Sequence, residues 1–478
     1  MKMGICIIFW VPTFAGTTEN AMAKLISTNP AKNFEPVGSV NISTSRDLKQ
    51  KIEAANKAKL IWKQLGVKKR TQMLRPIYHE FIKRKKEIAL LTAKEIGTPV
   101  QNVLQDLNWD QDYFKWFLDN GEKYLTDEIT YRDKNQTHKI VYEPIGVAAV
   151  IVPWNFPWGN FLWGVIPNLI AGNTVVFKHS EECPLTGRLI EQIVETAKLP
   201  YGVFSEIYGD GKTGERLIDQ DIDLIWFTGS SRVGKFLYCK AGEKYIKAIL
   251  EMGGSNPAIV FEDADVHEIV DKLYAKRFGN CGQTCDALKR LLVHKSLFKQ
   301  IVGKLKKMAE SRIVGDPEDP KTQMGPLVSK RQLDLLESQV EDAIKKGAKI
   351  ITGGNRPKNL KGAYYLPTIL ARVKKNMRVW KEEVFGPVLV VVPFDSEKEA
   401  IELANDTSYG LGAQIHTQNK ERAARLAGKI DAGTIDINSA NHWLACTPFG
   451  GYKDSGMGRE HGAVGFRELC QIKVIASD

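Results

Sequence analysis

Between residues 147 and 261, short apolar runs alternate with longer segments in which apolar positions recur at helical spacing. The first run, VAAVIV at residues 147–152, is apolar throughout, which is typical of a strand buried on both faces. Strands that alternate with helices predict an α/β fold built on a parallel sheet. The expected strands are 147–152, 174–177, 203–208 and 224–227, the expected helices are 185–198 and 212–219, and a second α/β series opens with a strand at 257–261.

The chain before residue 147 has a different pattern, with Lys, Glu and Leu at helical spacing. Ser45 is expected to cap a helix that runs to about residue 65, and helical pattern continues to about residue 120. Residues 122–143 form two extended runs around a polar turn, which predicts a protruding hairpin. Near the end of the chain, a last strand is expected at 471–476.

Composition and charge narrow the function classes. The chain has 478 residues, which favours two or three domains, and 43% of them are hydrophobic. The net charge of +11 comes from basic residues dispersed among acids, so we expect solvated helix faces and no nucleic-acid partner. No stretch is long enough to predict a membrane span. Seven scattered cysteines indicate a reducing compartment, a cytoplasmic location, no disulfide framework and no metal site.

The first residues, MKMGICIIFWVPTFAG, combine a basic residue with an apolar run. We interpret residues 1–23 as an extension upstream of a true start at Met22. A signal peptide and a genuine N-terminal segment remain alternatives.

Three segments could bind a dinucleotide. GDGKTG at residues 209–214 matches G-x-G-x-x-G, but no acid follows at the required distance, and a structural turn is an alternative. In FTGSSRVG, residues 227–234, a strand runs into a small-residue turn and a helix, so Gly229 and Ser230 could meet an anion. Lys178 and Glu181 follow a predicted strand, where they could bind ribose hydroxyls. The carboxylate would repel a 2′-phosphate, which favours NAD over NADP.

Three further residues suggest covalent chemistry. Cys285 follows Gly282-Gln283-Thr284, a small turn that could place its thiol at a helix start, where the thiolate is favoured. Glu251 precedes two glycines and could act as a general base, and Asn155 could donate to an oxyanion. Cys285 and Glu251 also have plain structural interpretations, as a buried small side chain and as a turn residue.

The motifs together resemble the aldehyde dehydrogenase superfamily. The resemblance runs from about Ile26 to the end of the chain and rests on PWNFP (153–157), FKHSE (177–181), FTGSSRVG (227–234), EMGGSNP (251–257), GNCGQTC (279–285), EEVFGPV (382–388) and PFGGYKDSGMGRE (448–460). It implies that Cys285 is the nucleophile, that Asn155 holds the oxyanion and that Glu251 activates water to hydrolyse a thioester. Glu460 would be a second acid near the water path. The cofactor implied is NAD, with NADP less favoured.

The resemblance also implies cofactor ligands and an architecture. Lys178 and Glu181 would bind the adenosine ribose, Ser230 with Gly229 the pyrophosphate, and Glu383 the nicotinamide ribose beside Phe385. The expected architecture is an NAD-binding Rossmann-type domain, an α/β catalytic domain and an oligomerisation hairpin that makes a homodimer or homotetramer. Their expected ranges are 24–123 with 143–252, 253–449, and 124–142 with 467–478.

The sequence departs from the family pattern at two positions and leaves the substrate open. His179 replaces a common proline, with little expected effect, and Cys281 either fills space or forms an oxidised adduct with Cys285. The arginines of the succinate-semialdehyde branch are replaced by Trp163 and Gly279. Phe156, Trp163 and Phe449 would line the entrance, so we expect an apolar aliphatic or aromatic aldehyde. A semialdehyde dehydrogenase, a CoA-acylating relative and a non-catalytic protein with this fold are the alternatives.

Overall fold

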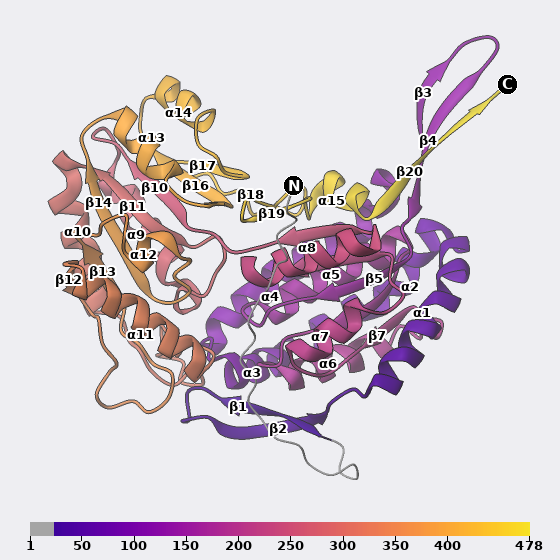
Figure 1. The fold of residues 1–478 in the computed structure, drawn as a ribbon, viewed down its shortest axis with the longest axis horizontal. Helices are drawn as coiled ribbons and strands as arrows, with labels where there is room; N and C mark the ends of the chain where they lie inside the picture. The colour runs from indigo at the N-terminus through magenta and orange to yellow at the C-terminus, as the bar shows by residue number, and fades with distance from the viewer. Residues whose placement is uncertain (1–22) are drawn as a thin grey trace, which may run out of the picture.

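The structure, a computed structural model, describes residues 23–478 as two lobes, each built on its own sheet (Figure 1). The lobe drawn in indigo and magenta holds a six-stranded sheet, and the lobe drawn in pink and orange holds a seven-stranded sheet. The α/β class predicted from the sequence is confirmed. The predicted extension at 1–23 lies outside the described residues except for Ala23.

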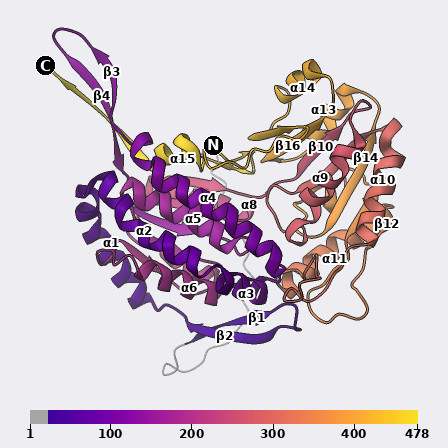
Figure 2. The same cartoon turned by 180° about the vertical axis from the view of Figure 1, so that it is seen from behind.

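The six-stranded sheet has the order β19-β9-β8-β5-β6-β7, parallel except for β19. Val147 and Ala149 of β5 pack with one apolar cluster, whereas Ala148 and Val150 pack with another, as a strand covered on both faces requires. Helices α4 and α5 cover one face, and α7 and α8 cover the other (Figures 1 and 2). The strands are β5 (Val147–Ile151), β6 (Thr174–Lys178), β7 (Phe204–Glu206), β8 (Leu224–Thr228), β9 (Lys247–Glu251) and β19 (Gly456–Met457).

Helices dominate the first part of this lobe. The capping prediction was off by one residue, because Thr44, not Ser45, is the N-cap: its hydroxyl accepts from the Asp47 N–H at 3.1 Å, and Asp47 accepts from the Thr44 N–H at 2.9 Å. The helices are α1 (Ser45–Gln64), α2 (Gly66–Lys83), α3 (Lys85–Ile96), α4 (Val100–Tyr124), α5 (Pro157–Ala171), α6 (Pro184–Glu195), α7 (Gly211–Ile218), α8 (Ser231–Lys244) and α15 (Gly462–Glu468).

The seven-stranded sheet has the order β12-β13-β14-β11-β10-β16-β17. Helices α9 and α10 pack on one face, and α11 to α14 pack on the other. The strands are β10 (Asn256–Val260), β11 (Leu288–His294), β12 (Lys349–Thr352), β13 (Thr368–Ala371), β14 (Val388–Phe394), β16 (Gly412–His416) and β17 (Thr434–Ile437). The helices are α9 (Val266–Phe278), α10 (Lys295–Glu310), α11 (Lys330–Lys345), α12 (Arg378–Lys381), α13 (Glu397–Asn405) and α14 (Lys420–Ala427).

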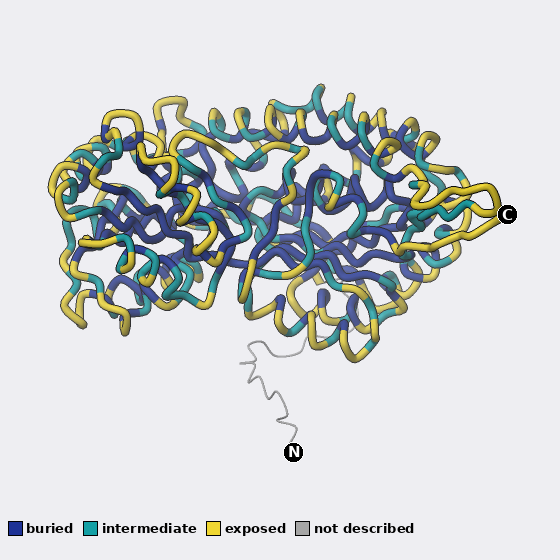
Figure 3. The backbone as a smooth tube through the Cα atoms, turned by 90° about the horizontal axis from the view of Figure 1, so that it is seen from above, coloured by how far each residue is buried: buried dark blue, intermediate teal, exposed yellow. Residues whose placement is uncertain are grey.

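The predicted hairpin protrudes from the first lobe beside the C-terminus (Figure 1). Strands β3 (Glu128–Arg132) and β4 (Thr137–Pro144) form it, and β20 (Cys470–Ser477) pairs antiparallel along the whole of β4. Figure 3 shows this three-stranded sheet as largely exposed. Its exposed side chains include Ile129, Tyr131, Ile472 and Val474.

The sequence pattern did not predict two small sheets. Strands β1 (Lys24–Asn29) and β2 (Glu35–Asn41) pair beneath the first lobe, and β15 (Tyr409–Gly410) pairs with β18 (Tyr452–Lys453). Within residues 23–478, no helix is both long and apolar enough to cross a membrane.

Candidate active site

A cavity of about 1680 Å³ lies between the two lobes and contains every side chain that the sequence analysis assigned to the site. It is large enough for a dinucleotide together with a small substrate. The carboxyl ends of parallel strands open into it, as expected for α/β sheets: Lys178 ends β6, and Glu251 ends β9. The predicted residues are therefore brought together, although their roles remain predictions.

Cys285 does not lie at a helix start, so that prediction was wrong. A 3₁₀ turn, η1 (Gly279–Gly282), precedes it, and the buried strand β11 follows it. Asn280 and Cys281 adopt left-handed conformations, with φ of 46° and 54°, so the chain turns sharply before it enters the sheet. The apolar residues after Cys285 form a central strand rather than a helix, because β10 and β14 pair with it on both sides.

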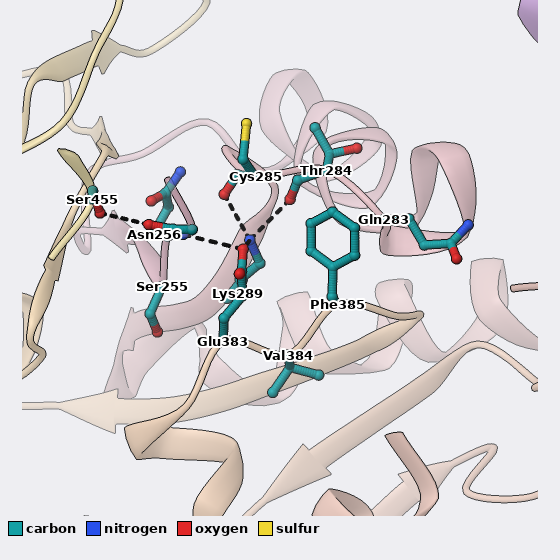
Figure 4. A network of polar contacts seen from close by, with 12 residues as sticks. Ser255, Asn256, Gln283, Thr284, Cys285, Lys289, Glu383, Val384, Phe385 and Ser455 are labelled. Carbon is teal, nitrogen blue, oxygen red and sulfur yellow. Dashed lines mark hydrogen bonds and ion pairs between the residues drawn. The ribbon is translucent and has the colours of Figure 1, made fainter. Parts of the chain in front are cut away.

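A buried lysine that the sequence analysis missed holds the cysteine loop. The Lys289 ammonium donates to the main-chain oxygens of Thr284 at 2.9 Å and Cys285 at 2.7 Å, and to Oε1 of Glu383 at 3.1 Å. The Cys285 sulfur points away from this lysine (Figure 4). The sequence does carry one signal for this role, because Lys289 lies within the apolar stretch ALKRLL. A lysine buried there requires a buried partner for its charge.

The Cys285 thiol is partly buried and has an acidic environment. Burial raises the pKa of Cys285 well above its usual value, and Glu251 and Asp286 raise it further, while Lys289 opposes them. The thiol in turn lowers the pKa of the Glu251 carboxyl group, which burial and the neighbouring carboxyl groups raise. Cys285 is therefore protonated at neutral pH in this state, and Glu251 is the group placed to receive its proton.

Asn155 is joined to the cysteine loop by a small amide network. Its Nδ2 donates to the main-chain oxygen of Gln283 at 3.1 Å, and Nδ2 of Asn280 donates to the main-chain oxygen of Asn155 at 2.9 Å. An amide has two N–H groups, so the second donor of Asn155 remains for an oxyanion near Cys285. Asn280 and Gln283 were not predicted as site residues.

Two buried carboxyl groups, Glu251 and Glu460, face the same cavity. Burial raises the pKa of Glu251 well above its usual value, with Glu460 adding to the effect, and burial raises the pKa of Glu460 to about 8. Among the described residues, Oε1 of Glu251 and Oε2 of Glu460 have no hydrogen-bond partner. Both groups are therefore available to a water molecule or a proton.

The cavity wall on the first lobe fits a dinucleotide. The hydroxyl of Ser230 caps α8 by accepting from the Val233 N–H at 3.4 Å, and the buried Oγ1 of Thr228 beside it has no hydrogen-bond partner within residues 23–478. A Cβ at Gly229 would lie 2.5 Å from the Phe227 ring, so a larger residue would have to displace this ring. A free hydroxyl at a helix N-terminus suits a phosphate.

The other dinucleotide motif serves a structural purpose. Asp210 caps α7 with its own carboxylate, which accepts from the Thr213 N–H at 3.2 Å. A negative group already occupies this helix start, so the α8 turn is the better phosphate site. Lys178 is buried at the end of β6, with Glu181 3.9 Å from its ammonium, an arrangement suited to ribose hydroxyls.

The loop that carries Glu383 and Phe385 closes the far side of the cavity. The Gly254 N–H donates to Oε1 of Glu383 at 3.1 Å, and a Cβ at Gly253 would lie 2.2 Å from Oε2 of the same residue. The Phe385 ring meets the Trp154 ring edge to face at 5.6 Å. Glu383 thus lies between the end of β9 and the Cys285 loop.

His179 and Cys281 both point into packed interior. His179 pairs with the buried carboxyl group of Glu206, and burial lowers the pKa of His179 to about 3. Cys281 belongs to the apolar cluster beneath α11, and burial raises its pKa to about 12. The packing of Cys281 favours the space-filling interpretation.

Aromatic rings line the cavity near Cys285. Trp443, which was not predicted, lies 4.7 Å from Phe449 and 5.7 Å from Trp163, measured between ring centres. Phe156 also lines the cavity. The missed lining residues include Asp106, Trp109, Asp110 and Asp286.

Comparisons with known proteins agree with this geometry. A model of the aldehyde dehydrogenase family matches residues 17–475. The chain belongs to the aldehyde dehydrogenase family. A betaine aldehyde dehydrogenase of Bacillus subtilis is 37% identical over 448 residues, which cover 92% of this chain and 91% of the relative.

Solved aldehyde dehydrogenase structures share the fold across almost the whole chain. An NAD⁺ complex of an aldehyde dehydrogenase from Bacillus cereus has a TM-score of 0.92 and 33% identity, and covers 95% of this chain and 93% of that chain. A betaine aldehyde dehydrogenase from Staphylococcus aureus with NAD⁺ has a TM-score of 0.91 and 32% identity, and covers 95% and 91%. The protein is therefore an oxidoreductase that acts on aldehydes.

Proposed function

We propose that this protein oxidises aldehydes to carboxylic acids with NAD, through a covalent intermediate on Cys285 that water hydrolyses. The observation that carries the proposal is that the Cys285 thiol, the Glu251 carboxyl group and the Asn155 amide line one cavity, where Glu251 and Cys285 influence each other's pKa. A nucleophile, a base and an oxyanion donor in one site are the requirements of acyl transfer.

The residues suggest the order of the steps. Glu251 takes the thiol proton as sulfur attacks the aldehyde carbon, and the oxygen of the resulting thiohemiacetal accepts a hydrogen bond from Asn155. A dinucleotide held by Lys178, Glu181 and Ser230 would supply the hydride acceptor for this carbon, and loss of the hydride would leave a thioester on Cys285. Glu251 releases the thiol proton to solvent and then removes a proton from water, which attacks the thioester. That second proton passes to the departing sulfur as the acid is released.

The cofactor proposal rests on Lys178, Glu181 and the α8 turn. Lysine donates to ribose hydroxyls and the carboxylate accepts from them, whereas that carboxylate would repel a 2′-phosphate. The NAD⁺ complexes among the similar structures support the preference for NAD.

For the substrate we propose an apolar aliphatic or aromatic aldehyde. The rings of Trp163, Trp443 and Phe449 supply an apolar wall, and Trp163 and Gly279 stand where a semialdehyde dehydrogenase would carry arginines. The route to Cys285 therefore lacks a clamp for a second carboxylate at those positions.

A cationic aldehyde is a second candidate, favoured by Asp106 and Asp110 beside these rings. Burial raises the pKa of Asp106 to about 7 and, together with Asp106, raises that of Asp110 well above its usual range. A bound cation would favour the ionised carboxylates and would also lie against aromatic faces. The betaine aldehyde dehydrogenases among the relatives act on a cationic aldehyde according to their name.

An aldehyde panel tests the proposal. Absorbance at 340 nm is followed with NAD or NADP, using acetaldehyde, phenylacetaldehyde and betaine aldehyde, and the products are identified by mass spectrometry. We expect NADH and free acid, without a requirement for CoA. A product that forms only with CoA, or no reduced cofactor with any aldehyde, would contradict the proposal.

The exposed sheet at the hairpin suggests how copies assemble. Apolar side chains on β3 and β20 are exposed, and an open strand edge can pair with another chain. We propose a homodimer or homotetramer that uses this sheet, to be tested by light scattering of the full chain and a variant lacking residues 470–478. The cytoplasmic location remains a prediction from cysteine usage.

A further inference from the structure

Asp286, the residue after the proposed nucleophile, has no part in the steps above, yet it is buried at the centre of a charged cluster. Its Oδ2 accepts from the Lys276 ammonium and from the Trp443 indole Nε1, the latter at 2.8 Å. Nε2 of His442 lies 3.7 Å from the same oxygen, and Nδ1 of His442 lies 3.0 Å from Asp436. The cluster thus ties α9 to the segment that follows β17.

The charge on Asp286 is maintained inside the protein. Burial alone would raise the pKa of Asp286, but the Lys276 ammonium, the neighbouring His442 and the hydrogen bonds from Lys276 and Trp443 together lower it to about 2. Asp286 is therefore an anion throughout the neutral range. A hydrogen bond from the indole to a charged acceptor is stronger than one to a neutral acceptor.

Trp443 needs such an anchor because its segment has little regular structure. Between β17, which ends at Ile437, and β18, which starts at Tyr452, the described chain forms neither helix nor strand. The fixed points in this stretch include side-chain bonds, namely Trp443 to Asp286 and His442 to Asp436. Trp443 itself belongs to no strand ladder, so the indole direction depends on its hydrogen bond to Asp286 and on the neighbouring rings.

The anchored indole belongs to the wall of the aldehyde pocket. Its ring lies 4.7 Å from the Phe449 ring and 5.7 Å from the Trp163 ring, and the His442 ring stacks on Phe449 with an interplanar angle of 2°. A change in the direction of Trp443 would displace this stack and change the width of the route to Cys285.

We propose that Asp286 is a positioning residue which accepts a hydrogen bond from the Trp443 indole, fixes the aromatic wall of the pocket and so sets the preference among aldehydes. The inference rests on the proposed function, because it concerns selectivity of that same site. Asp286 touches no reacting atom in these steps. Its charge also raises the pKa of Cys285, which affects all aldehydes alike, whereas its effect on the preference among aldehydes passes through Trp443.

The test compares the ratio of kcat/KM for phenylacetaldehyde to that for acetaldehyde in D286A, W443F, D286N and the double variant D286A/W443F. Loss of one hydrogen bond to a charged group should lower this ratio about tenfold in D286A and in W443F, mostly through KM for the larger aldehyde. D286N keeps an oxygen acceptor and should stay within about threefold of the parent. The double variant should match the single variants, because both remove the same interaction.

The outcomes separate the possible failures. If D286A does not fold, W443F still decides the question, since it removes the indole N–H while Asp286 keeps its charge and its lysine. An unchanged ratio in W443F, or effects that add in the double variant, would overturn the inference. If none of the aldehydes supports NAD reduction by the parent enzyme, the proposed function fails instead.

Discussion

Nζ of Lys289 lies 3.1 Å from Oε1 of Glu383, so one buried ammonium joins the cysteine loop to the loop that borders the proposed cofactor site. Lys289 also donates to the main-chain oxygens of Thr284 and Cys285. The position of the nucleophile is thus set by a side chain in the strand that follows it. This relationship makes the stability of the site depend on a residue outside the motif.

Replacement of Lys289 should destabilise the protein. K289M removes the ammonium from the Thr284 and Cys285 oxygens and leaves the buried Glu383 carboxylate without its counter-charge, and the loss of one partner of a buried pair costs about 3–5 kcal/mol of the free energy of unfolding. Urea denaturation measures this change in the free energy of unfolding. K345M is the matched control, because Lys345 is 78% exposed and should change the free energy by less than about 0.5 kcal/mol. If K289M and K345M have the same free energy of unfolding, Lys289 does not stabilise the cysteine loop as described.

The pH dependence of kcat should respond to Glu460. The Glu251 base works when ionised, and the neighbouring Glu460 carboxyl group raises the pKa of Glu251 in addition to burial. E460Q removes that charge, so the pKa of Glu251 falls and the rising limb of the kcat profile moves to lower pH. The exposed E402Q serves as control. If the rising limb of the kcat profile of E460Q stays at the pH of the parent, or moves to higher pH, the two carboxyl groups do not interact as described.

The same carboxyl group should affect stability with a defined sign. The pKa of Glu460 is about 8 in the folded protein, whereas an unfolded glutamate titrates near about 4.3. The folded state therefore holds the proton more tightly, and this contribution to stability is present below about pH 4 and is lost as pH rises to 8. Chemical denaturation at pH 5 to 9 should show E460Q gaining stability relative to the parent up to about pH 8, and a pH-independent difference would contradict the assignment.

Trp163 should contribute to binding of apolar aldehydes. W163A removes one ring of the aromatic wall and should raise KM for phenylacetaldehyde about tenfold, since a buried aromatic side chain contributes a few kcal/mol. W163F retains a ring and should lose less. Steady-state kinetics with acetaldehyde as the small comparison substrate measure the effect. Unchanged constants for both variants would remove Trp163 from the pocket.

The sequence predicted the α/β series well, because VAAVIV and the later apolar runs are short strands buried on both faces. Cys285 was misplaced at a helix start, because an apolar run such as ALKRLL is compatible with either element, and only pairing with β10 and β14 decides between them. Strands β1 and β2 lack a strong pattern because few of their side chains are buried.

For a related reason, only part of the candidate site could be predicted from the sequence. Residues within recognisable motifs, such as Asn155 and Glu251, could be assigned from type and spacing. Lys289, Asp286 and Trp443 act through partners distant in the sequence, and no local pattern marks a lysine or an aspartate that finds its partner only after folding. Such contacts require the structure.

The central claim is that Cys285 carries an acyl group that Glu251 helps to hydrolyse. The most direct measurement is intact-protein and peptide mass spectrometry of E251Q after reaction with NAD and phenylacetaldehyde. Loss of the base should slow hydrolysis by about 10²–10⁴-fold and should also slow deprotonation of the thiol, so after prolonged incubation phenylacetyl should accumulate on Cys285 with about one NADH per active site. C285S should show neither the adduct nor NADH. An active parent whose E251Q variant carries no adduct, or carries it on another cysteine, would contradict the account.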